Sequence, residues 1–201
     1  MKMLLHVGCG NKRKDRTTRG FNTDDWWEIR LDIDSSVNPD VIGTVSDMSG
    51  VATASVDAVF SSHNIEHLYP HEVPKAMEEF LRVLKPEGFA VVTCPDLRSI
   101  CARIAEDKLL DTLYQSAMGP ITPLDVMFGH RGSIAAGNLH MAHHTGYTKT
   151  SLTETLTRAG FKSVAAMERP AHFDLWAIAS KQALDGARAR ELITAHFPLN
   201  P

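Results

Sequence analysis

The chain has 201 residues, of which 43% are hydrophobic, and a formal net charge of −3. This length suits one domain with a full core, and the weak negative charge excludes a strongly basic surface for nucleic acid. Its three cysteines are widely spaced and odd in number, which argues against a disulfide framework and favours a cytoplasmic location. We expect no membrane anchor, because the amino terminus is too short in apolar length for a signal peptide and no run approaches the roughly 18 apolar residues of a span.

The first apolar run, residues 3–7, leads directly into Gly8, Cys9 and Gly10. Glycine lacks a Cβ atom, so such a turn can take positive φ and let a ligand lie against the main chain. Arg13 stands where a dinucleotide fingerprint has its third glycine, and no helical periodicity follows. We therefore expect a ligand-binding turn followed by a polar loop over residues 11–20, with little or no helix in the first crossover.

Three further segments of the first half show strand or helix patterns. Residues 56–60 form a buried-strand run, and Pro74 opens an amphipathic helix that extends to Leu84. Residues 89–93 are typical of another buried strand. A strand, a helix and a second strand in this order predict a parallel-sheet unit.

The second half of the chain predicts a mixed sheet. A helix is expected over residues 97–113, and a long irregular stretch, 119–148, has the character of a functional loop that covers a site. The pattern from Ser151 to Glu154 predicts a capping box, with Gly160 ending that helix. Two apolar runs then predict an antiparallel hairpin, and the tail has a moderately helical pattern. These runs cover residues 163–167, 175–179 and 182–196.

Several of these segments together resemble the class I S-adenosylmethionine-dependent methyltransferases, and in particular a small bacterial "type 11" group. The resemblance is carried by L-H-V-G-C-G, L-D, D-M, S-S-H-N-I-E-H-L and R-V-L-K-P-E-G, in which Glu87 replaces a glycine of the group's pattern. It implies a Rossmann-like, doubly wound α/β fold whose seven-stranded sheet has a reversed last strand. We expect a single methyltransferase domain, 1–201. It would comprise a cofactor-binding half, a part with the substrate loop and the C-terminal strands, and a tail helix: 1–97, 98–181 and 182–201.

The resemblance also implies how S-adenosylmethionine would be held. Asp32 would accept both ribose hydroxyls, because an ionised carboxylate acts only as an acceptor; Asp34 is the competing candidate. Asp47 would reach the adenine amino group, and Met48 would pack on the ring. The full set of expected cofactor-binding residues is His6, Gly8, Cys9, Gly10, Asp32, Asp47, Met48, Ser62 and His63.

The chain has ten histidines, and several of them cluster. The string from His63 to His67 matches the H-x-x-E-H motif of a zinc-peptidase group, but that motif requires a helix and here it follows a strand. We therefore predict no metal site. His63 is the first candidate for a catalytic base, followed by His143 and His144 in the irregular segment.

The predicted function is methyl transfer from S-adenosylmethionine to a small-molecule, sugar or metabolite acceptor by in-line displacement. Nucleic acid and membranes are not expected as partners, and the reversed final strand or the tail helix could supply a homodimer surface. Two alternatives stay open: a metal-dependent hydrolase that uses the histidine clusters, and a non-catalytic relative that only binds the cofactor.

Overall fold

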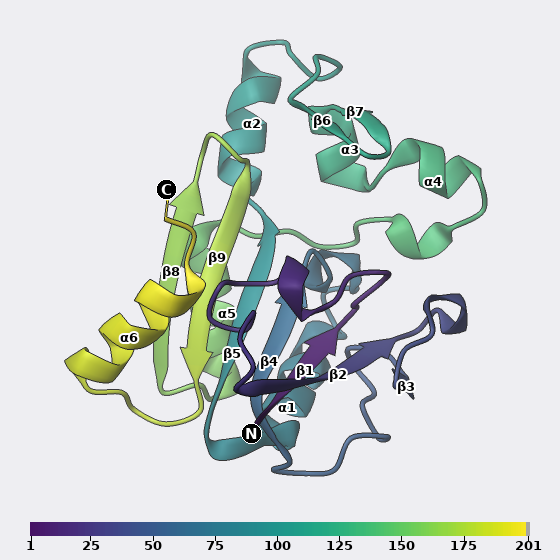
Figure 1. Ribbon diagram of the computed structural model, residues 1–201. Coiled ribbons are helices and arrows are strands. Elements are labelled where there is room, and N and C mark those ends of the chain that lie inside the picture. The colour runs from purple at the N-terminus through teal and green to yellow at the C-terminus, as the bar shows by residue number, and fades with distance from the viewer. Residues whose placement is uncertain (200–201) are drawn as a thin grey trace.

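A seven-stranded sheet organises the part of the chain described by the computed structural model, residues 1–199 (Figure 1). The strand order is β3-β2-β1-β4-β5-β9-β8, and β9 runs antiparallel to both of its neighbours while β3, β2, β1, β4 and β5 are mutually parallel. This confirms the Rossmann-like sheet with a reversed last strand. The strands are β1 (Lys2–Val7), β2 (Trp26–Asp32), β3 (Val41–Ile42), β4 (Val56–Ser62), β5 (Leu84–Pro95), β8 (Ser163–Arg169) and β9 (Asp174–Ser180).

The reversed strand β9 lies inside the sheet, between β5 and β8. Its backbone is paired on both sides, so it offers no free edge to a second copy of the chain. A dimer that pairs the edges of two sheets on this side would therefore not form through β9. The outer strand on this side is β8.

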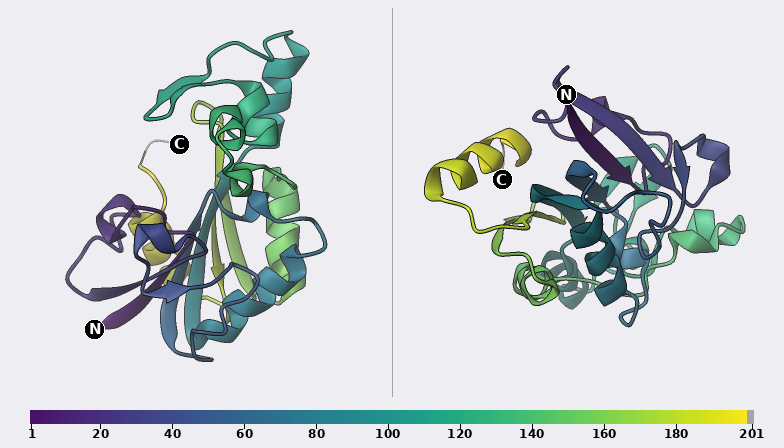
Figure 2. Two further views of the ribbon diagram at one scale, coloured as in Figure 1. Left: turned by 90° about the vertical axis from the view of Figure 1, so that its right-hand side faces the viewer. Right: turned by 90° about the horizontal axis from the view of Figure 1, so that it is seen from below.

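One face of the sheet is covered by two helices that follow the predicted pattern, α1 (Val73–Val83) and α5 (Lys149–Ala159) (Figure 2). The sheet residues Leu5 and Val59 belong to the same buried cluster as Phe80 and Leu152 from these helices. Alternation along the strands sends these residues to one face, where the apolar stripes of α1 and α5 cover them.

Both ends of α5 are set by particular residues. Thr148 accepts a hydrogen bond from the Ser151 backbone, and Gly160 ends the helix with φ +117°. The stop at Gly160 is confirmed. The predicted start at Ser151 is wrong, because Thr148 is the capping residue and Ser151 is its partner in the third helical position.

The opposite face of the sheet is covered in a different way. Between β1 and β2, within the described range, the chain forms the 3-10 turn η1 (Lys14–Arg16) and no α-helix, which confirms the shortened first crossover. The tail helix α6 (Gly186–His196) packs on this face instead, through Leu192 beside Phe21 and Phe60. Its last turn is bound to the crossover loop, because Gly20 N donates to Ala195 O at 2.9 Å.

A lid stands over the carboxyl ends of the parallel strands in both figures (Figures 1 and 2). The prediction that residues 119–148 are irregular is wrong, since this stretch holds two short helices and half of a hairpin. The predicted helix over 97–113 is also shorter than expected, because it ends at Ala105. The lid elements are α2 (Leu97–Ala105), β6 (Tyr114–Ser116), β7 (Gly119–Ile121), α3 (Pro123–Phe128), α4 (Arg131–Ala135) and the 3-10 turn η4 (Leu139–Met141).

The lid has a small core of its own, in which Ile100, Ile121 and Val126 are buried together. Thr122 and Asp125 form a reciprocal capping box at the start of α3, and Pro123 occupies the first turn. This local signal was present in the sequence but lies in a stretch too short to show helical periodicity.

None of the helices described for residues 1–199 is long and apolar enough to cross a membrane.

Candidate active site

The turn after β1 has the backbone conformation that its glycines predict. Gly8 and Gly10 have φ of +60° and +51°. A Cβ atom on Gly8 would lie 2.5 Å from the Asn64 side-chain nitrogen, whereas one on Gly10 would meet no atom of residues 1–199 within 4 Å. Gly8 is therefore required by close packing, and the main chain at Gly10 faces space that a ligand can enter.

Asp32 ends β2 next to this turn, and its side chain is buried. One carboxylate oxygen accepts from the Gly10 backbone at 2.7 Å and the other accepts from Asp34 N at 2.9 Å. Each oxygen keeps a further lone pair for another donor. Asp34, by contrast, is exposed and caps the 3-10 turn η2 (Ser35–Val37), where hydrogen bonds from Ser36 lower its pKa.

Arg30 is a structural residue of the site that sequence reasoning missed. It lies in β2, is 3% exposed, and donates from its guanidinium to the main-chain carbonyls of Gly10, Lys12, Val37 and Asn38. It thereby ties the glycine turn to the loop after β2. The available signal was a charged residue between the apolar residues Ile29 and Leu31.

Two other residues of the predicted set, His6 and Cys9, have buried side chains. His6 Nδ1 lies 2.8 Å from the Glu28 carboxylate, and its ring packs edge-on against Phe60. Burial raises the pKa of the Cys9 thiol to about 11, so the thiol is protonated at neutral pH. Neither side chain is exposed to a ligand, so any contact of Cys9 with a ligand goes through its main chain.

The remaining residues predicted to bind the cofactor differ in how far their side chains are exposed. Asp47 is exposed, and one of its oxygens accepts from Ser49 N at 3.2 Å. Met48 is fully buried in the core beneath α1, so packing of its side chain on an adenine ring would require the ring to reach into the core. Ser62, at the end of β4, accepts a hydrogen bond from Thr93 at 2.8 Å.

His63 follows β4 with φ +51°, and its backbone donates to Thr93 O at 2.9 Å. Its side chain is 48% exposed, with Nδ1 3.4 Å from a carboxylate oxygen of Glu66. Burial opposes the charged ring, but the neighbouring Glu66 outweighs this and raises the pKa of His63. Burial likewise opposes ionisation of Glu66, yet His63 and two further histidines keep its pKa below the usual value.

The lid brings His143 to Glu66 but not the ring of His144. His143 Nδ1 donates to Val126 O at 2.8 Å, its ring lies edge-on to His67, and desolvation lowers its pKa. The ring of His144 instead stacks on Tyr69 with 4.0 Å between centroids. Two of the three histidines predicted to be catalytic therefore flank one buried carboxylate.

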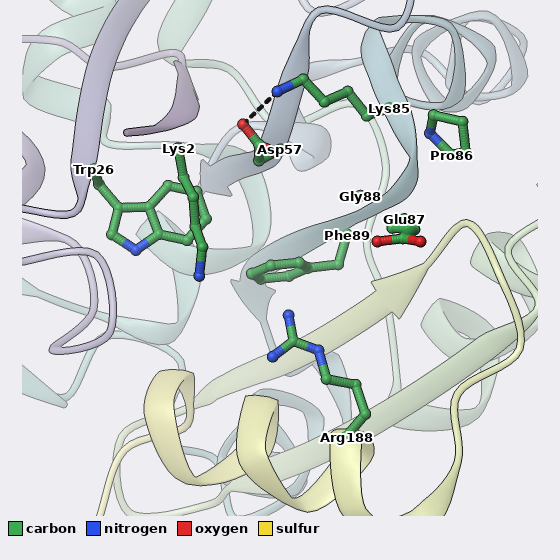
Figure 3. Close-up of a pocket in the computed structure, with 9 residues that line it drawn as sticks. All are labelled: Lys2, Trp26, Asp57, Lys85, Pro86, Glu87, Gly88, Phe89 and Arg188. Carbon is green, nitrogen blue, oxygen red and sulfur yellow. Dashed lines mark hydrogen bonds and ion pairs between the residues drawn. The ribbon is translucent and has the colours of Figure 1, made fainter.

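A separate cavity of about 410 Å³ lies at the opposite end of the strands, between the sheet and α6 (Figure 3). Lys85 and Asp57, which both line it, form an ion pair at 2.7 Å, and Lys2 lies over the Trp26 ring. Because Lys2 and Trp26 are the first residues of β1 and β2, this cavity is at the amino edge of the sheet. Ligands of open α/β sheets bind at the carboxyl edge, where the glycine turn and Asp32 are.

A glycine turn after the first strand and a carboxylate at the end of the second define an α/β protein that binds a nucleotide-type cofactor. Residues 5–92 match the model of a family described as "Methyltransferase domain". The chain is therefore similar to this family over residues 5–92, and the strand order is the one that class I S-adenosylmethionine-dependent methyltransferases have. No curated protein sequence matches the chain.

Solved structures share the fold at low sequence identity. A SAM-dependent methyltransferase from Methanosarcina mazei has a TM-score of 0.57 and 16% identity, with 91% of this chain and 93% of that one covered. The 1,6-didemethyltoxoflavin-N1-methyltransferase of Burkholderia thailandensis, solved with that compound and S-adenosylhomocysteine, has a TM-score of 0.56, 15% identity, and coverage of 90% and 72%. A SAM-dependent methyltransferase from Archaeoglobus fulgidus has a TM-score of 0.55, 14% identity, and coverage of 90% and 86%.

Proposed function

We propose that the chain methylates a small-molecule acceptor bound between the carboxyl edge of the sheet and the lid. The observation that carries this proposal is the hydrogen bond between Gly10 N and Asp32, which joins an open glycine turn to a carboxylate at the cofactor edge. The toxoflavin methyltransferase, which has the same fold, was solved with a small molecule, 1,6-didemethyltoxoflavin, bound to it. Residues 1–97 would then bind the cofactor, 98–181 would form the lid and last strands, and 182–201 the tail.

The residues at this edge fit the chemistry of S-adenosylmethionine, which supplies an electrophilic methyl group on a sulfonium. The main chain of the turn Gly8–Cys9–Gly10, which is open at Gly10, would hold the methionine portion, and Asp32 would accept the ribose hydroxyls with its free lone pairs. Asp47 would face the adenine, Met48 would support this part of the site from the core, and Ser62 would border the slot at the end of β4. His6, which is buried in β1 and paired with Glu28, would support the glycine turn without touching the cofactor through its side chain.

Catalysis would depend mainly on alignment, because methyl transfer from a sulfonium is an in-line displacement. His63 would accept the proton that a hydroxyl or ammonium acceptor loses, since its half-exposed ring stands at the carboxyl end of β4. His143 would be the second candidate, from the lid side. His144 would line the lid only through its stack on Tyr69.

We also assign the reaction to the cytoplasm, because Cys9, Cys94 and Cys101 are all free in the described chain. The outer face of α6 is the proposed surface for a homodimer.

The first experiment is calorimetric titration of S-adenosylhomocysteine into the wild type and into two carboxylate variants. We expect Asp32→Asn to weaken binding by about 100-fold, because hydrogen bonds to a charged group contribute about 1.5–3 kcal/mol each. Asparagine keeps one acceptor oxygen, so one of the two backbone donors, Gly10 N or Asp34 N, retains its partner. Asp34→Asn is the matched control, and it should leave the affinity unchanged.

Equal loss in both variants, or loss in the Asp34 variant alone, would overturn the assignment of Asp32. If the wild type binds no S-adenosylhomocysteine, the cofactor proposal itself fails. A transfer assay with methyl-labelled S-adenosylmethionine then separates acceptor classes, using pools of small metabolites, an oligonucleotide and a protein extract. Label in the small-molecule pool, reduced in His63→Gln, supports the proposal, whereas label in either polymer contradicts it.

A further inference from the structure

Three side chains on the acceptor side form a cluster that the proposed chemistry does not use as a unit. Glu66 and His67 come from the 3-10 turn η3 (Ile65–His67), and His143 comes from the lid. One potential ligand atom from each residue lies within 4.8 Å of the others. The topology therefore brings a carboxylate and two imidazoles to one point.

The carboxylate of this cluster lacks the partners that a buried charge requires. Glu66 is 1% exposed, and within residues 1–199 neither of its oxygens has a hydrogen-bond partner. His63 Nδ1 is within ion-pair distance of one oxygen at 3.4 Å, but no cationic side chain in the described part of the chain forms an ion pair with the other oxygen. Buried charges are normally paired or bound to a metal, so this carboxylate is incomplete in the protein alone.

Both imidazoles are held through Nδ1 by main-chain carbonyls. His67 Nδ1 lies 3.0 Å from Ala142 O, and His143 Nδ1 lies 2.8 Å from Val126 O. A carbonyl can only accept, so each Nδ1 carries the hydrogen and each Nε2 keeps its lone pair. A metal-binding histidine is typically held in this way, by a hydrogen bond from its other ring nitrogen to a carbonyl or carboxylate.

We propose that Glu66, His67 and His143 bind one divalent transition-metal cation, of which Zn²⁺ is the best fit. Two imidazoles and one carboxylate are a known three-ligand set for zinc sites that keep a position open. The cation would neutralise the Glu66 carboxylate and join the lid to the end of β4. Resting on the proposed function, the open position would hold an oxygen or nitrogen of the acceptor beside the cofactor edge.

The sequence predicted no metal because His63 and His67 do not lie on one helix. The structure agrees that these two do not form a helical pair, but it replaces His63 with a histidine from the lid. Spacing along the chain could not show this, because the third ligand reaches the site only when the lid folds over the strand ends.

The test is a titration of Zn²⁺ into the full chain after treatment with EDTA and removal of the chelator, followed by calorimetry. Co²⁺ is used in parallel as an absorbing probe of the coordination geometry. We expect one cation per chain, and His143→Gln and Glu66→Gln should each weaken binding by more than the roughly 10–100-fold that loss of a supporting hydrogen bond costs. His144→Gln is the control, because its ring stacks on Tyr69 outside the cluster.

Thermal unfolding and S-adenosylhomocysteine binding are measured on the same samples. We expect both glutamine variants to keep their cofactor affinity, so loss of the metal and loss of the cofactor site can be told apart. Zn²⁺ should raise the unfolding temperature of the wild type and of His144→Gln but not of Glu66→Gln. Absence of binding, binding that survives in both cluster variants, or equal loss in the His144 control would overturn the proposal.

Discussion

The two sides of the carboxyl edge are built in opposite ways. On the cofactor side, the guanidinium of Arg30 is satisfied by four carbonyls and the carboxylate of Asp32 by two backbone N–H groups. On the acceptor side, Glu66 is buried without a hydrogen-bond partner in residues 1–199. A satisfied network is rigid and contributes to stability, whereas groups left open are available to a ligand. The cofactor side is thus preformed by hydrogen bonds to the backbone, whereas the acceptor side needs a bound ligand to complete its hydrogen bonds.

Arg30→Met should break the cofactor side and have the largest effect on stability. We expect the free energy of unfolding to fall by at least about 3 kcal/mol, because four main-chain carbonyls lose their donor and hydrogen bonds to a charged group contribute about 1.5–3 kcal/mol each. Affinity for S-adenosylhomocysteine should fall as well, since Gly10 loses its anchor. Urea denaturation and calorimetry measure the two effects.

Arg98→Met is the matched control for this change. Its guanidinium is 77% exposed and 3.6 Å from Glu168, so we expect a change of less than about 0.5 kcal/mol. A loss of that small size in Arg30→Met would show that the carbonyls find other donors, and the contrast between the two sides would not hold.

The free energy of unfolding should depend on pH through His196, the last residue of α6, which packs against the crossover loop between β1 and β2. This side chain is buried against Thr18, 2.7 Å from its hydroxyl, and desolvation lowers its pKa to about 4. In the unfolded chain His196 takes up a proton with a pKa of about 6.5, whereas in the folded chain it does so only near pH 4. The stability from His196 is therefore fully present above pH 6.5 and is lost as the pH falls to 4, by about 3 kcal/mol in total.

His196→Gln removes this titration and leaves a group that can bond to the Thr18 hydroxyl. We expect the free energy of unfolding of the variant to fall less steeply between pH 7 and pH 4 than that of the wild type. Parallel curves for the two proteins would show that the loop and α6 separate before the histidine is protonated.

The sequence and the structure agree best where a local pattern decides the backbone. The apolar runs of β1 and β4, the stop at Gly160 and the missing first crossover helix could all be predicted, because each depends on residues near one another in the chain. The role of Arg30 and the meeting of His143 with Glu66 could not, because they require the tertiary fold. The helix α3 was missed for a third reason: its six residues are too few for periodicity, although the Thr122 cap marked it.

A smaller effect is expected from the lid, where Asp125 closes the capping box of α3. Burial opposes its ionisation, but hydrogen bonds from Arg131 and Thr122 outweigh this and hold the pKa of Asp125 well below its usual range. Asp125→Ala should destabilise the lid locally by about 1–2 kcal/mol. Hydrogen exchange should therefore quicken over residues 119–135 while β1 and β4 stay protected and the cofactor affinity is unchanged.

Faster exchange throughout the sheet would instead mean that the lid is part of the global folding unit. Ser116→Ala serves as a control inside the lid, because its hydroxyl bonds within the β6–β7 turn and does not reach α3. This variant should leave the exchange of α3 unchanged.

The smallest effect on stability should come from His143→Gln in the metal-free protein. Its ring donates one hydrogen bond to Val126 O, which a glutamine amide can replace, so the free energy of unfolding should change by less than about 1 kcal/mol. The expected contrast with Arg30→Met is a small loss of stability in EDTA and a loss of the stabilisation that Zn²⁺ gives the wild type. If His143→Gln destabilises the metal-free chain as much as Arg30→Met does, the histidine is part of a preformed network. The two sides of the edge would then be built alike.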